Sequence, residues 1–336
     1  MKFSRTGWGP FRILPTVMDE RYTPRSFRGS VDLPAMVELR NAKMVAEGRE
    51  NLITVEGLAQ QYEHLQRCDP ERDILLVEHG DRLVGYARTT WDDVAEGYRG
   101  YWVVAVAQPD HPELEHSLYD WVESRVKEIA AGHPAGDKRL MTYCDEAAPT
   151  ADLLRRRGYT PERYATVMVR PHLEDIHDRK LPAGVEIRPV EDGHLRQIWE
   201  ADVEAFRDHR GFIEPTETDW EAWLASPNWD PGLWQVAWAG DQVVGQVRSY
   251  IDPVENERWQ RKRGWTEDIS TVREWRRKGI AGALICASLC RLRERGMTEA
   301  ALEVDTENLT GAFRLYESLG FVRTRLEVFF TRPVGE

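Results

Sequence analysis

A basic, glycine-containing turn at residues 276–282 carries the residue types best suited to bind a ligand. A strand-like segment, 268–272, precedes the turn, and a helix-like segment, 283–295, follows it. A turn that opens a helix gathers free backbone N–H groups at the positive end of the helix dipole, where an anion can bind. A side chain at Gly279 would crowd an approaching phosphate. The turn therefore indicates a pyrophosphate site, with a solvated helix start as the simpler alternative; matching positive charge comes from Arg276, Arg277 and Lys278.

A second motif begins at Asn308, with the spacing Asn-x-x-x-Ala-x-x-Leu-Tyr-x-x-x-Gly-Phe, and ends at Phe321. Together with Arg-x-x-Gly-x-Ala at residues 276–281, it resembles the two signatures of the GNAT N-acetyltransferases, in the family's order. The resemblance covers residues 185–332 and implies acetyl-CoA as the co-substrate. Asn308 would then bond the pantetheine arm or nearby backbone, or else cap the following helix. The implied cofactor-binding set is Val272, Arg276, Arg277, Lys278, Gly279, Ile280, Ala281, Gly282 and Asn308.

Two adjacent carboxylates, Glu267 and Asp268, open the strand that leads to the turn. Acetyl transfer to an amine needs a base that takes a proton from the ammonium group, directly or through water. The place of Glu267, nine residues before Arg276, resembles family members in which a carboxylate is this base. Strand alternation predicts that only one of the two acids faces the site. Glu267 is the favoured base, with Asp268 or a merely solvated pair as alternatives.

Tyr316 is the predicted acid. It lies on the apolar stripe of a helix expected over 311–319, where its phenol, with a pKa of ~10, could protonate the departing thiolate. A core tyrosine is the alternative. The resemblance also implies that a backbone N–H at Val272 or its neighbour, on a splayed strand, polarises the thioester carbonyl.

Aromatic and polar residues of the same half are candidates for an acceptor pocket. Trp229 and Trp259 lie in polar surroundings, where an indole can hold a cationic amine by a cation–π contact. The helical run 204–212 occupies the place of the family's acceptor-shaping helices, so Asp208 and His209 could touch substrate. Core tryptophans and a solvated helix end are the alternatives.

Composition indicates a soluble, globular protein. The chain has 336 residues, of which 41% are hydrophobic and 30% charged, and its net charge is −12. This acidic balance argues against a nucleic-acid partner and suits a cationic amine. No apolar run is long enough for a membrane span or a leader, so we expect a cytoplasmic protein without a membrane partner. The four cysteines and nine histidines lack ligand-like spacing, which predicts no metal.

Repeated segments predict two copies of one domain. Gly80-Asp81 recurs as Gly240-Asp241 between apolar strands, and residues 153–159 match 315–321 at an offset of 162. Each copy reads as strand, helical pair, hairpin, long strand, helix, strand, helix, strand. This order predicts an α/β fold with a mixed sheet, as two tandem GNAT-type domains. The predicted limits are 1–171 for the N-terminal domain with its extension, 172–184 for a linker and 185–336 for the acetyl-CoA-binding domain.

The N-terminal copy lacks the basic turn. In its place stands Gln108-Pro109-Asp110-His111-Pro112-Glu113, whose prolines lack an N–H and whose acids would repel phosphate. We therefore expect this copy to have a structural or substrate-shaping role.

The sequence thus predicts an acetyl-CoA-dependent N-acetyltransferase with one working site, in its C-terminal copy. A primary amine, held as a small-molecule acceptor, would attack the thioester directly. The architecture resembles two-copy acetyltransferases of the mycothiol synthase type, acting as a monomer or homodimer. Two alternatives remain open: a non-catalytic sensor of acetyl-CoA, and an acyltransferase that uses a longer acyl-CoA.

Overall fold

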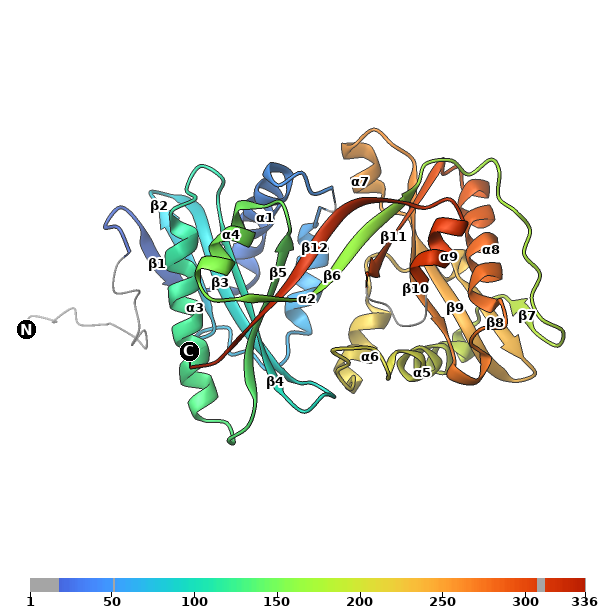
Figure 1. The fold of residues 1–336 in the computed structure, drawn as a ribbon. Coiled ribbons are helices and arrows are strands. Elements are labelled where there is room, and N and C mark those ends of the chain that lie inside the picture. Colours follow the sequence, from blue (N-terminus) through green and yellow to red (C-terminus); the bar gives the residue numbers. More distant parts are fainter. Residues whose placement is uncertain (1–17, 51, 307–311, 336) are drawn as a thin grey trace, which may run out of the picture. The chain divides into compact units, whose positions relative to one another are not determined.

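The structure, a computed structural model, describes residues 18–50, 52–306 and 312–335. These residues form two compact units, whose elements are labelled in Figure 1. Unit 1 contains the described residues up to 142, together with 152–160 and those from 330 on. Unit 2 contains residues 143–151 and the described part of 161–329.

Unit 1 contains strands in the order β1-β2-β3-β4-β5, all antiparallel neighbours except the parallel pair β4 and β5. The long helix α3 packs on β3 and β4, and α1, which contacts α2, packs on the same two strands. Its elements are β1 (Thr23–Ser26), α1 (Leu33–Ala46), α2 (Val55–Glu63), β2 (Ile74–His79), β3 (Arg82–Asp93), β4 (Arg99–Ala107) and α3 (Leu114–Ala131), while β5 (Lys138–Asp145) and α4 (Pro149–Arg156) are divided between the units.

Unit 2 contains strands in the order β12-β6-β11-β10-β9-β8-β7, in which β10 and β11 are parallel. Its elements are β6 (Thr160–Arg170), β7 (Glu186–Arg188), α5 (Leu195–Phe206), α6 (Glu217–Leu224), β8 (Gln235–Ala239), β9 (Gln242–Tyr250), α7 (Pro253–Arg258), β10 (Arg263–Thr271), α8 (Ile280–Glu294), β11 (Glu299–Asp305), α9 (Ala312–Ser318) and β12 (Val322–Pro333).

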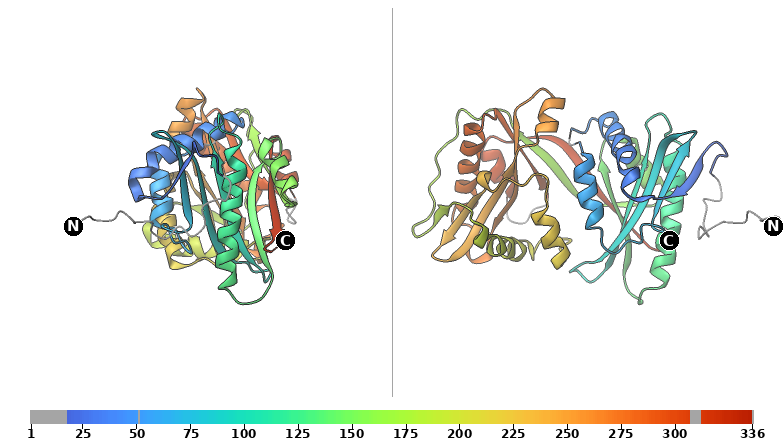
Figure 2. Two further views of the ribbon diagram at one scale, coloured as in Figure 1. Left: turned by 90° about the vertical axis from the view of Figure 1, so that its left-hand side faces the viewer. Right: turned by 180° about the vertical axis from the view of Figure 1, so that it is seen from behind.

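Helices α5 and α8 cover opposite faces of the unit 2 sheet, as Figures 1 and 2 allow the reader to follow. Neighbouring residues of a strand point to opposite faces. On β9, Arg248 contacts Asp202 of α5, whereas Ser249 hydrogen-bonds to Ser288 of α8. The apolar side of α8 is buried in the core, which fixes the turn that begins this helix against the sheet.

The predicted repeat is visible in matching turns of the two copies. Gly80 and Gly240 occupy the hairpin turns β2–β3 and β8–β9 with positive φ angles of 61° and 58°. Helices α4 and α9 both end at a glycine in the left-handed conformation. In both, the N–H of the next aromatic residue closes the helix, through Tyr159 N to Leu154 O at 3.0 Å and Phe321 N to Tyr316 O at 3.1 Å. The mixed α/β fold and the duplication are therefore confirmed.

The compact units do not follow the predicted limits at residues 171 and 185, because the copies exchange segments. Strand β6, which ends the first copy, pairs with β11 of the second, with Met168 opposite Leu302. Both of these side chains are fully buried in the unit 2 core, so hydrophobic packing draws β6 into that unit. Conversely, residues 330–333 at the end of β12, and the described residues after them, belong to unit 1. The limits of the two domains stay a prediction about the repeat. None of the helices that the structure describes is long and apolar enough to cross a membrane.

Candidate active site

Strand β10 contains a bulge at the two predicted acids. Opposite β9, Glu267 pairs with Arg248, but Ser270 pairs with Gln246, so Asp268 and Ile269 together face one residue. Asp268 has a φ angle of 48°, which few non-glycine residues adopt. The alternation expected along this strand is therefore wrong, because the bulge places Glu267 and Ser270 on the same face of the sheet.

The pairing of β10 with β11 ends before the bulge. Their pairing ends at Trp265 opposite Ala301, although both strands continue for several residues. The prediction of a splayed strand agrees with this register. The N–H of Val272, however, donates to Val244 O at 3.1 Å, so it is not the free donor that the resemblance implied. By alternation of the antiparallel ladder with β9, the N–H groups of Ile269 and Thr271 point instead towards the gap.

Glu267 extends across this gap. Its Oε1 accepts a hydrogen bond from the backbone N–H of Glu303 on β11, at 3.0 Å. Burial of the carboxyl group raises the pKa of Glu267 well above its usual value. The nearby carboxylates of Asp268 and Glu303 raise the pKa further, and the bond from Glu303 N–H partly opposes this. With its raised pKa, the Glu267 carboxylate binds a proton more strongly than an ordinary glutamate does, which favours a role as a base.

Tyr316, on α9, lies close enough to Glu267 for their charges to interact. Burial raises the pKa of the Tyr316 phenol well above 10, and the Glu267 carboxylate adds to this shift. The phenol therefore keeps its proton, as a general acid must. The same side chain packs in the hydrophobic core, edge-to-face against Phe321, so its role as a core tyrosine is also satisfied. Asn308, the other residue of this motif, lies outside the described residues.

The basic turn ends in an uncapped helix start. Gly279 occupies the N-cap position of α8 with a φ angle of 85° and has no side chain to cap the helix. Ala283 N donates to Gly279 O at 3.1 Å, so the N–H groups of Ile280, Ala281 and Gly282 precede the first helical bond. A Cβ at Gly279 would meet no described atom within 4 Å, so this glycine is required for its backbone conformation. The turn can therefore present three N–H groups to an anion.

The three basic side chains of the turn differ in their contacts. Arg276 is committed to the protein: it donates to Thr271 O, Ala205 O and both carboxylate oxygens of Asp208. Arg277, with a φ angle of 65°, is exposed, and Lys278 Nζ lies 4.3 Å from the ring centre of Trp275. Charge for an anion at this turn thus comes from Arg277 and Lys278.

Asp208 fastens the end of α5 to the turn. Hydrogen bonds and charge from Arg276 lower the pKa of Asp208 to about 2. Its carboxylate is therefore occupied in the described structure, and the predicted contact with substrate has no support from this geometry. His209 lies against Phe206, with ring centres 4.5 Å apart, and burial lowers its pKa.

Replacing Asp208 by Asn removes the ion pair with Arg276 and is expected to destabilise unit 2 by about 1 kcal/mol at pH 7. The effect is this small because the pair is partly exposed to solvent. Because the pKa of Asp208 is lowered by folding, its carboxylate stabilises the folded state fully above the pKa of the unfolded chain, about 3.9. This stabilisation is lost as the pH falls towards the folded-state pKa of about 2. The difference in unfolding free energy between wild type and variant should therefore be largest at pH 7 and smaller at pH 3, as measured by urea unfolding followed by fluorescence. An equal difference at both pH values would refute the ion pair between Asp208 and Arg276.

Of the two tryptophans predicted for the acceptor pocket, Trp229 lies next to two indoles that flank a cation of the protein itself. The guanidinium of Arg248 lies 5.0 Å from the ring centre of Trp223 and 5.8 Å from that of Trp234. Trp229 packs edge-to-face on both indoles. Trp259 ends α7, on the β9–β10 connection, away from the turn at the other end of β10. These contacts favour a core role for Trp229, and Trp259 is not among the indoles that surround Arg248.

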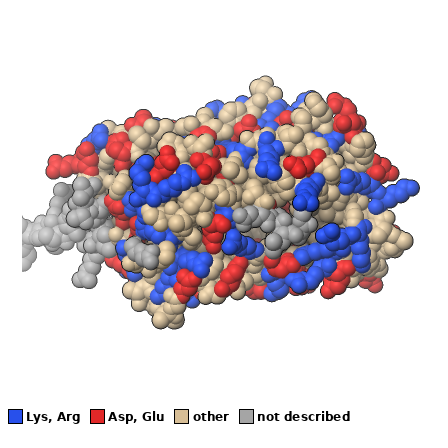
Figure 3. All heavy atoms as spheres, in the orientation of Figure 1, with Lys and Arg blue, Asp and Glu red and all other residues tan. Residues whose placement is uncertain are grey.

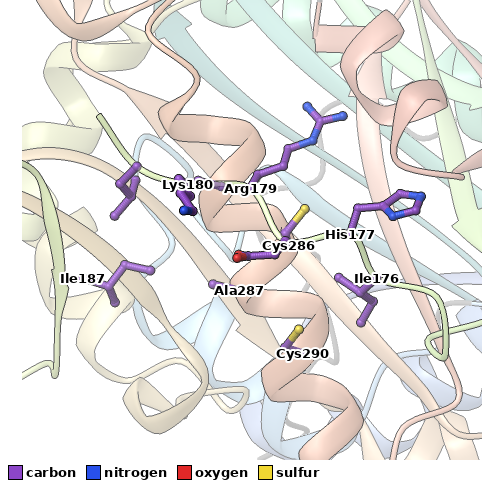
Figure 4. A pocket seen from close by; sticks show the side chains of 11 residues that line it. Ile176, His177, Arg179, Lys180, Ile187, Cys286, Ala287 and Cys290 are labelled. Atoms are coloured by element: carbon purple, nitrogen blue, oxygen red, sulfur yellow. The ribbon is translucent and has the colours of Figure 1, made fainter. Parts of the chain in front are cut away.

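A pocket of about 450 Å³ lies between α8 and the chain segment 176–187. Figure 4 shows Arg179 and Lys180 of that segment near Cys286 and Cys290 of the helix. Arg179 also reaches the first turn of α8, where a Cβ at Gly282 would come within 2.9 Å of its Nη1. Sequence reasoning missed these cations because the segment was interpreted only as a polar linker.

Charges of both signs are interspersed on the face of each unit drawn in Figure 3. Within the described ranges, no group of three or more His, Cys, Asp or Glu side chains is arranged to hold a metal ion. The four cysteines are free thiols, of which Cys144 and Cys286 are buried.

Comparisons with known proteins identify the class of protein to which this chain belongs. The sequence profile described as Acetyltransferase (GNAT) family matches residues 195–321. An enzyme of Thermomonospora curvata named mycothiol acetyltransferase is 30% identical over 286 residues, which cover 83% of this chain and 88% of that enzyme. The chain belongs to the GNAT family of N-acetyltransferases.

Solved structures agree with this assignment. The GCN5-related N-acetyltransferase from Sphaerobacter thermophilus superimposes with a TM-score of 0.70 at 25% identity, covering 95% of this chain and 97% of its own. A tandem GNAT protein from the clavulanic acid biosynthesis pathway has a TM-score of 0.63 at 15% identity, covering 94% and 98%. The chain is thus an acetyl-CoA-dependent N-acetyltransferase with two copies of the GNAT fold.

Proposed function

We propose that acetyl transfer takes place in unit 2, at the gap between β10 and β11. One observation carries this proposal: Glu267 spans the gap with a raised pKa, on the strand that leads into the uncapped turn of α8. The turn would hold the pyrophosphate of acetyl-CoA through the N–H groups of Ile280, Ala281 and Gly282. The thioester would then lie in the gap, between Glu267 and Tyr316.

The reaction proposed is direct attack of a primary amine on the thioester carbonyl carbon. Glu267 takes the proton of the ammonium group, and the free amine forms the new C–N bond. A backbone N–H of β10 that points into the gap stabilises the oxyanion, a contribution of about 3 kcal/mol. The C–S bond then breaks, and the phenol of Tyr316 gives its proton to the departing thiolate. The nitrogen of the new amide gives its surplus proton to the phenolate, directly or through water, and Glu267 releases its proton to solvent. All atoms and charges balance without a covalent enzyme intermediate or a metal ion.

A small-molecule amine is the proposed acceptor. The name of the Thermomonospora curvata relative supports testing amines related to mycothiol first. We place the reaction in the cytoplasm, with a chain that works as a monomer or homodimer. The donor is proposed to be acetyl-CoA itself, which competition with longer acyl-CoA esters would test.

Unit 1 is proposed to hold no co-substrate. At the position of the basic turn, its acids are already engaged: Asp110 pairs with Arg82, and Glu113 accepts hydrogen bonds from Tyr22 and Arg21. The arginines next to the start of α3 are thus paired with these acids and are not available to a phosphate.

Tyr316→Phe tests whether the protein turns acetyl-CoA over or only binds it. The expected result is a kcat about 10²–10³-fold lower with an unchanged dissociation constant for acetyl-CoA, because the phenol acts only as the thiolate leaves. Phe keeps the core packing, since Tyr316 lies edge-to-face on Phe321. Phe313→Tyr, on the same helix but only partly buried, serves as a control for the helix. An unchanged kcat would exclude Tyr316 as the acid, and no turnover by wild type with any amine would favour the sensor.

A further inference from the structure

An ion pair with the neighbouring strand β9 stabilises the bulge of β10. Asp268 has a φ angle of 48° and is not a glycine, so its backbone conformation costs about 1 kcal/mol unless other contacts stabilise it. Such a contact exists, because Asp268 Oδ2 lies 3.0 Å from Nη2 of Arg248 on β9. The charged side chain of Arg248 is therefore directed at the one strained residue of the strand.

Arg248 itself is fixed from several sides. Its Nη2 also donates to Asp202 Oδ2 on α5 at 2.9 Å, and its guanidinium is flanked by Trp223 and Trp234. Only 6% of the Arg248 side chain is exposed. A planar guanidinium held in this way has little freedom to move, so it fixes the position of the Asp268 carboxylate.

This arrangement is costly for the fold. Within the described part of the chain, Nε and Nη1 of Arg248 and Oδ1 of Asp202 are buried without a hydrogen-bond partner. Each such group costs about 1–3 kcal/mol, more than a surface ion pair returns. Hydrophobic residues in place of both Arg248 and Asp202 would leave no such group, so stability alone does not explain the pair.

We propose that Arg248 and Asp268 form a latch that holds the β10 bulge and thereby positions Glu267 for proton transfer. The inference rests on the proposed function of unit 2. Glu267 directly precedes Asp268 and pairs across the strands with Arg248, so the latch acts on the peptide that joins the two acids. The bulge also turns the N–H of Ile269 towards the gap. Arg248 and Asp268 are thus positioning residues, while Glu267 is the catalytic base.

The latch has an electrostatic signature. The groups that face Glu267 are Asp268 on its own strand, Arg248 and Tyr250 on β9, Glu303 on β11 and Tyr316 on α9. Among them, the Asp268 carboxylate is the main charge that raises the pKa of Glu267. Removing that charge should lower the pKa, so the rate should rise with pH at a lower pH than in wild type.

The test compares Asp268→Asn, Asp268→Gly and Asp268→Ala by the pH profile of kcat with acetyl-CoA and the amine that the wild type uses. Asp268 is half-exposed, so these variants leave the core intact. All three should shift the rise of kcat to lower pH. Loss of the latch should lower the plateau about tenfold to hundredfold, because a misplaced base loses orientation. The loss should be smallest in Asp268→Gly, since glycine adopts the bulge conformation without strain.

Two variants of Arg248 test the latch independently, in case the Asp268 variants lose the bulge conformation. Arg248→Lys retains the charge and should keep more of the plateau than Arg248→Met, with the same KM for acetyl-CoA. If all Asp268 variants keep the wild-type plateau and profile while Glu267→Gln is inactive, the latch is refuted and the proposed function stands. If an Asp268 variant loses the pH-dependent rise altogether, Asp268 is the base itself and the latch is likewise refuted. If Glu267→Gln retains full activity, the proposed function fails, and the latch fails with it.

Discussion

Glu267→Gln is expected to lower kcat by about 10²–10⁴-fold while acetyl-CoA binds as in wild type. The amide keeps the shape of the side chain and can still reach Glu303 on β11, but it cannot accept a proton from the ammonium group. In wild type, kcat should rise with pH through the raised pKa of Glu267, because only the carboxylate is a base. That rise should be absent from the variant.

Steady-state kinetics across pH 5–9 would measure this, with Glu257→Gln as the matched control. Glu257 is an exposed carboxylate on α7 of the same unit, so its substitution changes the net charge equally without touching the gap. Equal losses in both variants, or none in Glu267→Gln, would contradict the assignment of the base.

Gly279→Glu is expected to weaken acetyl-CoA binding at least about a hundredfold, which corresponds to about 2.7 kcal/mol. Its carboxylate would lie at the uncapped start of α8, where it can accept the N–H groups proposed for the pyrophosphate and repel the phosphates. The backbone strain of a non-glycine residue at a φ angle of 85° adds about 1–2 kcal/mol.

Two further variants separate charge from strain. Gly279→Ala carries the strain without the charge, and Gly279→Asn tolerates the left-handed conformation but can cap the helix. Both should fold, because a Cβ at this position meets no described atom within 4 Å. The affinity for acetyl-CoA, measured by calorimetry, should be lower in the Ala and Asn variants than in wild type and lowest in the Glu variant. A Glu variant that binds as wild type would remove the turn from the co-substrate site.

The features of this fold that depend on local interactions could be predicted from the sequence. Hairpin turns such as Gly240-Asp241 and helix ends such as Gly320 require particular backbone angles, and the structure shows positive φ at both glycines. The turn at Gly279 belongs to the same class. Such positions are predictable because the residue type itself restricts the conformation.

The remaining features depend on contacts between distant segments. Nothing in the local sequence shows that β6 packs beside β11, since Met168 and Leu302 are ordinary apolar strand residues. The bulge at Asp268 was missed for a similar reason, because Arg248 lies twenty residues earlier and only the paired strands bring it near. Alternation therefore failed at the position where the structure departs from regular strand geometry.

Tryptophan content was informative about packing but misleading about ligands. An indole pair that flanks a cation could serve an acceptor amine, yet Trp223 and Trp234 flank Arg248. Likewise Asp208 and Arg276 were interpreted as separate site residues, whereas they bind each other. In both cases a charged group finds its partner within the chain, which residue type and spacing do not reveal.

The stoichiometry of acetyl-CoA binding tests the central claim most directly. Calorimetric titration of the full chain, with Gly279→Glu as the comparison, should give one site per chain in wild type and none in the variant. Two sites in wild type, or one site that persists in the variant, would place co-substrate binding outside the turn of α8. Absence of binding to the wild type would contradict the account as a whole.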